Sequence, residues 1–202
     1  MDKLIDDLIK LAFAEDIGDG DHTTLCCIPE TAMGKSQLII KEDGVLAGVE
    51  MAKRIFHDFD PELKMTVFIQ DGAEVKKGDI AFVVEGKIQS LLQTERLMLN
   101  VMQRMSGIAT TTRKYAKALE GTKTHVLDTR KTTPGMRMIE KEAVRIGGGM
   151  NHRIGLFDMI LLKDNHVDFA GGIEQAITRA QNYLKEKGKN LKIAVSYTHL
   201  TL

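Results

Sequence analysis

Residues 124–166 read THVLDTRKTTPGMRMIEKEAVRIGGGMNHRIGLFDMILLKDNH, and this stretch decides the class of fold. THVLDT and DMILLKD have the length and apolar content of buried strands, and the stretch Pro134–Ile146 between them favours a helix. Thr133 is predicted to cap this helix, with Pro134 in its first turn. Strands that alternate with helices at intervals of roughly 30 residues predict βαβ units in a parallel sheet or barrel.

The alternation continues beyond this stretch, with a helix predicted over Ile173–Lys187 and a strand at KIAV, residues 192–195. The first hundred residues have a different pattern. They predict helices at the N-terminus, up to EDIGDGD, and over VEMAKRIFHDF, and strands at SQLIIKED, LKMTVFIQ and IAFVVEG. A helical pattern from Ser90 to Leu119 is interrupted at Ser106-Gly107. We therefore predict two domains, residues 1–107 and 108–202.

Composition limits the classes of partner. Of the 202 residues, 43% are hydrophobic and 28% are charged, and the formal net charge is zero. This balance, with no tryptophan and no basic stripe, argues against nucleic-acid binding, and no segment has the length and apolarity of a membrane span. Cys26 and Cys27 are adjacent, a poor geometry for a disulfide, and we interpret them as reduced thiols of a cytoplasmic protein.

Cations gather where the predicted parallel strands end. The carboxyl ends of such strands, and the loops that follow them, form the binding sites of parallel α/β folds. Guanidinium groups bind carboxylates and phosphates through two hydrogen bonds, and the first N–H groups of the helix at Pro134 would add to an anion site. The sequence thus predicts a pocket for a substrate with several negative charges. Its candidate residues are Arg130, Lys131, Arg145, the run Gly147–Gly149, His152, Arg153 and Lys163.

Each of these features also has a simpler interpretation. An Arg or Lys after a strand is usually a solvated loop residue, three glycines can form only a flexible turn, and Asp164-Asn165-His166 can be a turn with local hydrogen bonds. The combination on two successive strand ends favours the site.

The same residues resemble a known family. VLDTRKTTPGMR, followed by KEAVRIGGGMNHRIGLFDMILLKDNH, is similar to the signature region of the quinolinate phosphoribosyltransferases. TERLMLNVMQRMSGIAT, EDIGDGDHTT and GVLAGVEMAKRIF match the same family, so that the resemblance covers roughly residues 1–195 in order.

The resemblance implies an N-terminal α/β sandwich domain followed by an open, TIM-like α/β barrel, here incomplete. It implies transfer of phosphoribose from phosphoribosyl pyrophosphate to quinolinate with Mg²⁺ and decarboxylation, the carboxylating nicotinate-nucleotide diphosphorylase reaction of NAD biosynthesis. Lys131 would face phosphoribosyl pyrophosphate. Lys131 and Lys163 would be catalytic through electrostatics, and Arg96 would be donated to the neighbouring site of a homodimer. Residues expected to line the quinolinate pocket are Arg130, His152, Arg153 and Lys163.

The resemblance fails after KIAV, where the chain reads SYTHLTL and stops. The family's later acidic strand ends, which help to bind magnesium and ribose, and its glycine-rich phosphate loop are missing. We therefore expect no metal ligand in this chain, a tail foreign to the gene, a C-terminally truncated protein, and weak or absent catalysis by this polypeptide.

Three other functions fit parts of the sequence. One is a paralogous phosphoribosyltransferase-like protein, such as the relative associated with molybdate transport genes. Another is a non-catalytic anion-binding or regulatory protein that keeps the pocket without the metal side. The third is a carrier module, because DGAEVKKGDIAFVVEG has the rhythm of biotinyl and lipoyl domains, although it lacks their MKM or DKA lysine motif.

Overall fold

The computed structural model describes residues 2–196 and divides the chain into two compact units. The first unit is Met1–Asn151 and the second is His152–Leu202. The predicted foreign tail falls mostly on residues 197–202, which lie outside the described residues.

The first unit contains an antiparallel sheet in the order β1-β5-β3. Met33 pairs with Lys87 at one end of β1, and Lys64 pairs with Glu85 at the start of β3. Strands were predicted in all three places, and the structure confirms them with shifted ends. Their bounds are Met33–Ile39 (β1), Lys64–Val67 (β3) and Ile80–Lys87 (β5), and a separate pair is formed by β2 (Gly44–Val45) and β4 (Glu74–Val75).

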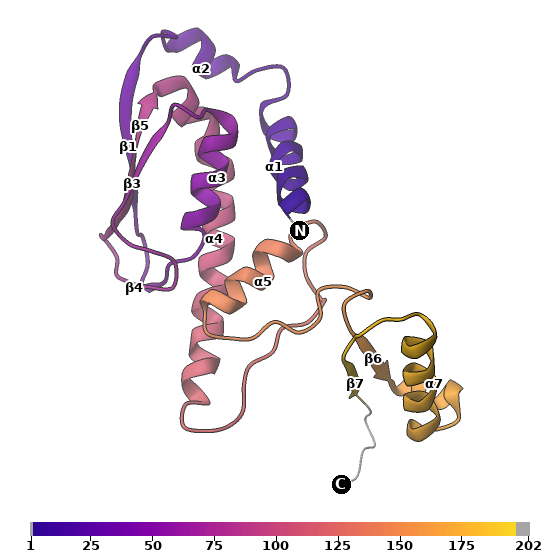
Figure 1. Ribbon diagram of the computed structural model, residues 1–202. Coiled ribbons are helices and arrows are strands. Elements are labelled where there is room, and N and C mark those ends of the chain that lie inside the picture. Colours follow the sequence, from indigo (N-terminus) through magenta and orange to yellow (C-terminus); the bar gives the residue numbers. More distant parts are fainter. Residues whose placement is uncertain (1, 197–202) are drawn as a thin grey trace. The chain divides into compact units, whose positions relative to one another are not determined.

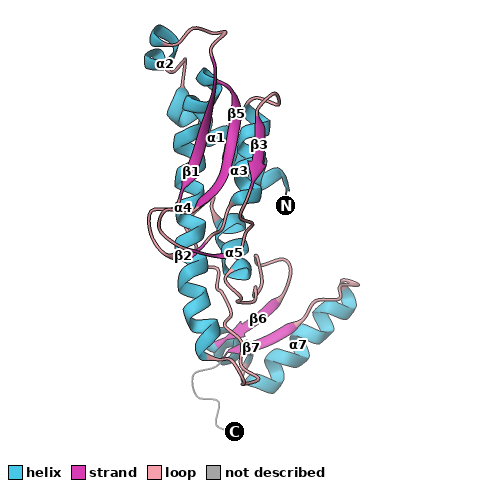
Figure 2. Ribbon diagram, turned by 90° about the vertical axis from the view of Figure 1, so that its left-hand side faces the viewer, coloured by secondary structure: helices cyan, strands magenta, loops and turns pink. Residues whose placement is uncertain are grey.

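Helices cover one face of this sheet, which makes the unit a sandwich (Figure 1). α3 (Val49–Phe59) and α4 (Ile88–Ala118) lie against the sheet, and α1 (Asp2–Ile17) lies on the side of these helices that faces away from it. Figure 2 shows the same layers from the side of the sheet. A short helix, α2 (His22–Cys27), precedes β1 and was not predicted.

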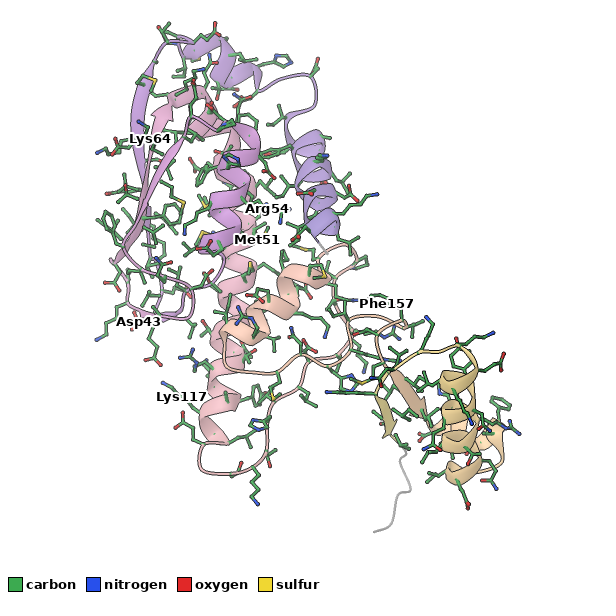
Figure 3. All side chains as sticks on the ribbon, in the orientation of Figure 1. Asp43, Met51, Arg54, Lys64, Lys117 and Phe157 are labelled. Atoms are coloured by element: carbon green, nitrogen blue, oxygen red, sulfur yellow. The ribbon has the colours of Figure 1, made fainter. Side chains whose placement is uncertain are left out.

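Apolar spacing explains why these helices form and pack. In α3, residues Ala52, Ile55 and Phe56 recur on one face and are buried against the sheet. On its other side, Arg54 forms an ion pair with Asp6 of α1, and its label in Figure 3 lies between the two helices.

The predicted interruption at Ser106-Gly107 is wrong, because α4 is one helix of 31 residues. Glycine costs about 1 kcal/mol relative to alanine in a helix interior. The apolar face nevertheless continues across it through Met102, Met105 and Ala109, all buried, and this packing outweighs the local cost.

Two predictions for residues 124–146 are also wrong. THVLDT forms no strand; it contributes a single parallel bridge, between Leu127 and Met150. The helix begins at Arg137, because Pro134-Gly135 is a turn closed by the Met136 N–H on the Thr133 carbonyl, at 3.0 Å. Gly135 has φ +79°, which a helix cannot include. Thr133 is therefore not a cap, and the helix α5 is Arg137–Ile146.

The second unit is a small α/β layer. Strands β6 (Ile160–Lys163) and β7 (Ile193–Ser196) pair in parallel, as predicted, and Ile160 lies opposite Ile193. The connection contains α6 (Asp164–Ala170) and α7 (Ile173–Glu186). Leu162, Val167 and Ala176 form its buried core. Asp164-Asn165-His166 begins a helix, so that the alternative interpretation as a turn does not hold.

None of the helices in the described part of the chain is long and apolar enough to cross a membrane.

Candidate functional site

The loop from Thr129 to Thr133 carries two of the predicted site residues, Arg130 and Lys131. It follows directly on the bridge at Leu127, where the Met150 N–H donates to the Val126 carbonyl at 2.8 Å. The Lys131 N–H donates to the Thr129 hydroxyl at 3.1 Å, which turns the chain at the cationic pair.

A buried ion pair fixes the start of this loop. Lys141 of α5 bonds Asp128, and their side chains are only 3% and 6% exposed. In the amide orientation that satisfies its neighbours, Asn151 donates to the Asp128 carboxylate at 2.7 Å and to the Lys141 carbonyl at 2.8 Å. The sequence analysis missed all three residues.

A second group fixes the end of the loop. Glu140 of α5 accepts bonds from Arg104 of α4, and Arg104 also donates to the Thr133 hydroxyl at 2.8 Å. Arg137 donates to the Thr132 hydroxyl at 3.1 Å and to the Arg130 carbonyl at 3.3 Å. Arg137, Glu140 and Lys141 of α5 thus hold the loop in place.

The two cations of the loop are left out of this network. Within residues 2–196, neither the Arg130 guanidinium nor the Lys131 ammonium forms an ion pair, and Lys131 is exposed. Unneutralised cations on a fixed loop are suited to binding an anion, because their charge is not already satisfied by a carboxylate.

The second unit positions its candidates on a tight turn and a strand end. Arg153 is 7% exposed and donates to the Met159 carbonyl at 3.4 Å, and the Asp158 carboxylate accepts the N–H groups of Ile154 and Gly155, both at 2.8 Å. Lys163 ends β6 and is exposed, and its own N–H donates to His166 Nδ1 at 3.1 Å.

Two predicted features do not belong to an anion site. Arg145 is engaged with Glu142 through bonds of 2.5 and 2.9 Å, which lower the pKa of Glu142 and raise the pKa of Arg145. The glycine run is needed for packing: a Cβ on Gly147 would lie 2.5 Å from the Ala109 carbonyl oxygen, and one on Gly149 would lie 2.8 Å from Val144 Cγ1. These glycines let α5 approach α4 and are not a flexible turn.

The structure thus brings Arg130 and Lys131 together on one loop of the first unit, while His152, Arg153 and Lys163 belong to the second. Arg96 is exposed on α4, eight residues before Arg104, which corresponds to about 12 Å along a helix. It is therefore separate from the loop cluster.

A groove between β1 and α4 is a different feature. It has a volume of about 960 Å³, and its largely apolar lining includes Leu38, Ile40, Leu91 and Met98. None of the six predicted site residues, all within the described part of the chain, lines it.

The missed residues of α5 gave no signal in the sequence. Ile139 and Ala143 lie on one face of the helix, but Glu140 and Lys141 follow Ile139 by one and two positions and lie away from that face. Arg104 gave no signal either, because α4 was predicted to be broken two residues later.

A sandwich followed by a pair of parallel strands defines an α/β protein. The chain belongs to the quinolinate phosphoribosyltransferase family. The family's N-terminal domain model, "Quinolinate phosphoribosyl transferase, N-terminal domain", matches residues 21–106, and its C-terminal domain model matches residues 108–200. The two models meet inside α4, whereas the compact units meet at residues 151 and 152. The domain boundary at 107/108 stays a prediction.

Curated relatives and solved structures agree with this assignment. The chain is 46% identical over 189 residues to quinolinate phosphoribosyltransferase (decarboxylating) 1 of Nicotiana glauca, covering 93% of the chain and 53% of the relative. It is 43% identical to a probable nicotinate-nucleotide pyrophosphorylase (carboxylating) of Synechocystis, covering 89% of the chain and 61% of the relative. The chain thus spans about half the length of the plant relatives.

The crystal structure of NadC from Streptococcus pyogenes superposes with a TM-score of 0.88 at 40% identity, covering 96% of this chain and 68% of that one. The nicotinate-nucleotide pyrophosphorylase of Francisella tularensis superposes with a TM-score of 0.83 at 36% identity, over 96% and 67%. These neighbours confirm the predicted fold class, an α/β sandwich domain followed by α/β barrel units.

Proposed function

We propose that the natural protein containing this chain transfers phosphoribose from phosphoribosyl pyrophosphate to quinolinate and releases pyrophosphate and carbon dioxide. The product is nicotinate mononucleotide, an intermediate of NAD biosynthesis. The observation that carries the proposal is the loop with Arg130 and Lys131, whose cations form no ion pair within residues 2–196 while the charged groups behind them are paired. Membership of the family supplies the reaction.

The proposed chemistry needs charge more than acid–base catalysis. A pyridine nitrogen has a free electron pair, so it attacks the ribose carbon without first losing a proton, and the bond to pyrophosphate breaks. The positive charge of the ring stabilises the electron pair left at C2 when the 2-carboxylate departs as carbon dioxide, and C2 then takes up a proton from water to give the product. Catalysis then comes from positioning the two substrates and stabilising the developing charges.

The residue roles follow the resemblance. Arg130, His152, Arg153 and Lys163 would hold the two carboxylates of quinolinate, and Lys131 would face the phosphates. The burial of Arg153 and the position of Lys163 at a strand end support roles in binding. Lys131 and Lys163 are proposed to act through their charge, without a covalent intermediate.

Mg²⁺ is proposed to bind together with phosphoribosyl pyrophosphate. Among residues 2–196 there is no cluster of three His, Cys, Asp or Glu side chains that could hold a metal ion. Mg²⁺ would be bound mainly through the phosphate groups of phosphoribosyl pyrophosphate, with few protein ligands.

A homodimer in which Arg96 reaches the neighbouring site, and a cytoplasmic location, stay predictions of this proposal. The exposure of Arg96 on α4 is compatible with the first. The names of two plant relatives place them in chloroplasts and mitochondria, so the family itself does not fix a compartment.

The test uses the natural protein containing this chain and quinolinate labelled at the 2-carboxylate. Labelled carbon dioxide is expected only when phosphoribosyl pyrophosphate and Mg²⁺ are both present, and Lys131→Gln is expected to lower kcat/KM at least tenfold, about 1.4 kcal/mol. Quinolinate binding without carbon dioxide release would instead favour a non-catalytic anion-binding protein. The proposal is refuted if the protein shows no quinolinate binding and no carbon dioxide release.

A further inference from the structure

The side chains behind the Thr129–Thr133 loop form a continuous network with two helices. Glu140 is at its centre, with a side chain only 9% exposed. Its Oε1 accepts bonds from Arg104 Nε at 3.0 Å and Nη2 at 2.6 Å, and its Oε2 accepts the Thr133 N–H at 3.3 Å. Both oxygens of a nearly buried carboxylate are therefore used.

Arg104 connects this carboxylate to the loop by a second route. The same Nη2 that bonds Glu140 also donates to the Thr133 hydroxyl at 2.8 Å. Arginine is suited to this role because its planar guanidinium holds several donors in a fixed geometry. Arg104 and Glu140 together hold the backbone and the side chain of one residue, Thr133.

The contacts of this network leave the functional groups of the loop free. Arg137 donates to the Arg130 carbonyl and to the Thr132 hydroxyl. Arg104 donates to the Thr133 hydroxyl, and the Glu140 carboxylate accepts the Thr133 N–H. The Arg130 guanidinium and the Lys131 ammonium take part in none of these bonds. The network thus fixes where the two cations are attached without neutralising them.

We propose that Arg104 and Glu140 are positioning residues that set the direction of Arg130 and thereby the preference for a vicinal dicarboxylate over a monocarboxylate. This inference rests on the proposed function. Two adjacent carboxylates must both meet their cations, and displacements of about 1 Å at such a site cost up to a hundredfold in rate. A monocarboxylate needs only one cation and tolerates a displaced loop.

The test compares Arg104→Met and the milder Glu140→Gln with Lys117→Met. Lys117 is a matched control because it lies near the end of the same helix, α4 (Figure 3), and pairs with Glu74 at 2.6 Å without touching the loop. Two quantities are measured in the natural protein. One is amide hydrogen exchange in residues 129–136, and the other is the ratio of dissociation constants for pyridine-3-carboxylate and pyridine-2,3-dicarboxylate.

Arg104→Met and Glu140→Gln are expected to speed amide exchange in the loop. They are also expected to lower the ratio of dissociation constants about tenfold, which corresponds to the loss of roughly one charge-assisted hydrogen bond to the dicarboxylate. Lys117→Met is expected to change neither. A general loss of stability would weaken both ligands alike and leave the ratio unchanged, and that result overturns the inference.

The exchange measurement separates this inference from the proposed function. If the wild-type protein binds no dicarboxylate but both loop variants exchange faster, the proposed function fails and the loop anchoring stands, without a role in selectivity. If exchange in the loop is unchanged in both variants, the inference fails whatever the ligand.

Discussion

At the scale of single residues, the charges of α5 have opposite fates that their sequence positions do not reveal. Glu140 and Lys141 are buried in the network behind the loop, whereas Glu142 and Arg145 pair with each other and Arg145 is exposed. The candidate cations after the predicted strands could be proposed from the strand-loop pattern. The residues that hold the Thr129–Thr133 loop could not, because they come from α4, α5 and residue 151, which only the folded chain brings together.

The buried pair Lys141–Asp128 makes one prediction. Lys141→Met should lower the free energy of unfolding by about 3 kcal/mol, because it leaves the Asp128 carboxylate buried without its cation. The double variant Lys141→Met with Asp128→Asn should lose less than the single one, since the stranded charge is removed. Urea unfolding of the wild type, the two single variants Lys141→Met and Asp128→Asn, and the double variant measures this. A double variant that is as unstable as the sum of its single changes would show that the pair is not coupled.

A second prediction concerns pH. The Ser90 hydroxyl donates to Asp60 at 2.6 Å, and this bond is the main cause of the lowered pKa of the Asp60 carboxyl. A lowered pKa in the folded state means that its stabilising effect is complete above the unfolded pKa of about 3.9 and is lost as the pH falls through the folded value.

Ser90→Ala should therefore lower the free energy of unfolding by about 1 kcal/mol at pH 7. The difference from wild type should shrink as the pH falls below about 4 and through the lower folded pKa, below which the carboxyl is protonated in both states. Denaturant unfolding at several pH values checks this. A difference that does not shrink as the pH is lowered contradicts the assigned cause of the pKa shift.

At the scale of elements, helical periodicity predicted α3 with the bounds that the structure shows, because its buried face repeats without interruption. The same reasoning failed in α4, where a glycine was given more weight than the apolar face that crosses it. It also failed at Pro134, where the positive φ of Gly135 forms a turn and delays α5 to Arg137. In α4, packing of the apolar face outweighed the low helix propensity of glycine. At the start of α5, the prediction failed because the turn at Pro134-Gly135 was not recognised.

Two glycines test these elements in opposite directions. Gly147→Ala should lower the free energy of unfolding by about 2 kcal/mol, because its Cβ meets the Ala109 carbonyl oxygen at 2.5 Å and forces α5 away from α4. Gly107→Ala should raise it by about 1 kcal/mol, since nothing lies within 4 Å and the position is helical. Thermal unfolding compares them. Destabilisation by Gly107→Ala would contradict an unbroken, unobstructed α4.

At the scale of the whole molecule, the buried apolar side chains are divided unequally. One cluster joins α1, α3, α4, α5 and strand β5, and includes Ile55, Phe82 and Met105, each almost fully buried. The second unit has a small cluster around Leu162, Val167 and Ala176. The first unit should therefore be more stable against local unfolding than the second, because apolar burial is the main stabilising term in folding.

Native-state hydrogen exchange measures this difference. Amides of α3, α4 and β5 should be protected longest, and those of β6, α6 and β7 should exchange faster, because few buried apolar contacts hold the second unit. Equal protection in both units would contradict the predicted order and would point to stabilising contacts that the two clusters do not contain.

The order of the residues was enough to predict the kinds of elements in most places, the α/β class, the family and the clustering of cations within residues 130–163, because these depend on short-range periodicity and on residues that follow one another. The tertiary structure alone decided that α4 is continuous, that Gly147 is a packing position, and that Arg104, Glu140, Asp128 and Lys141 fix the Arg130–Lys131 loop. Those outcomes depend on burial and on contacts between residues far apart in the chain, such as Arg104 and Glu140, which only folding brings within hydrogen-bonding distance.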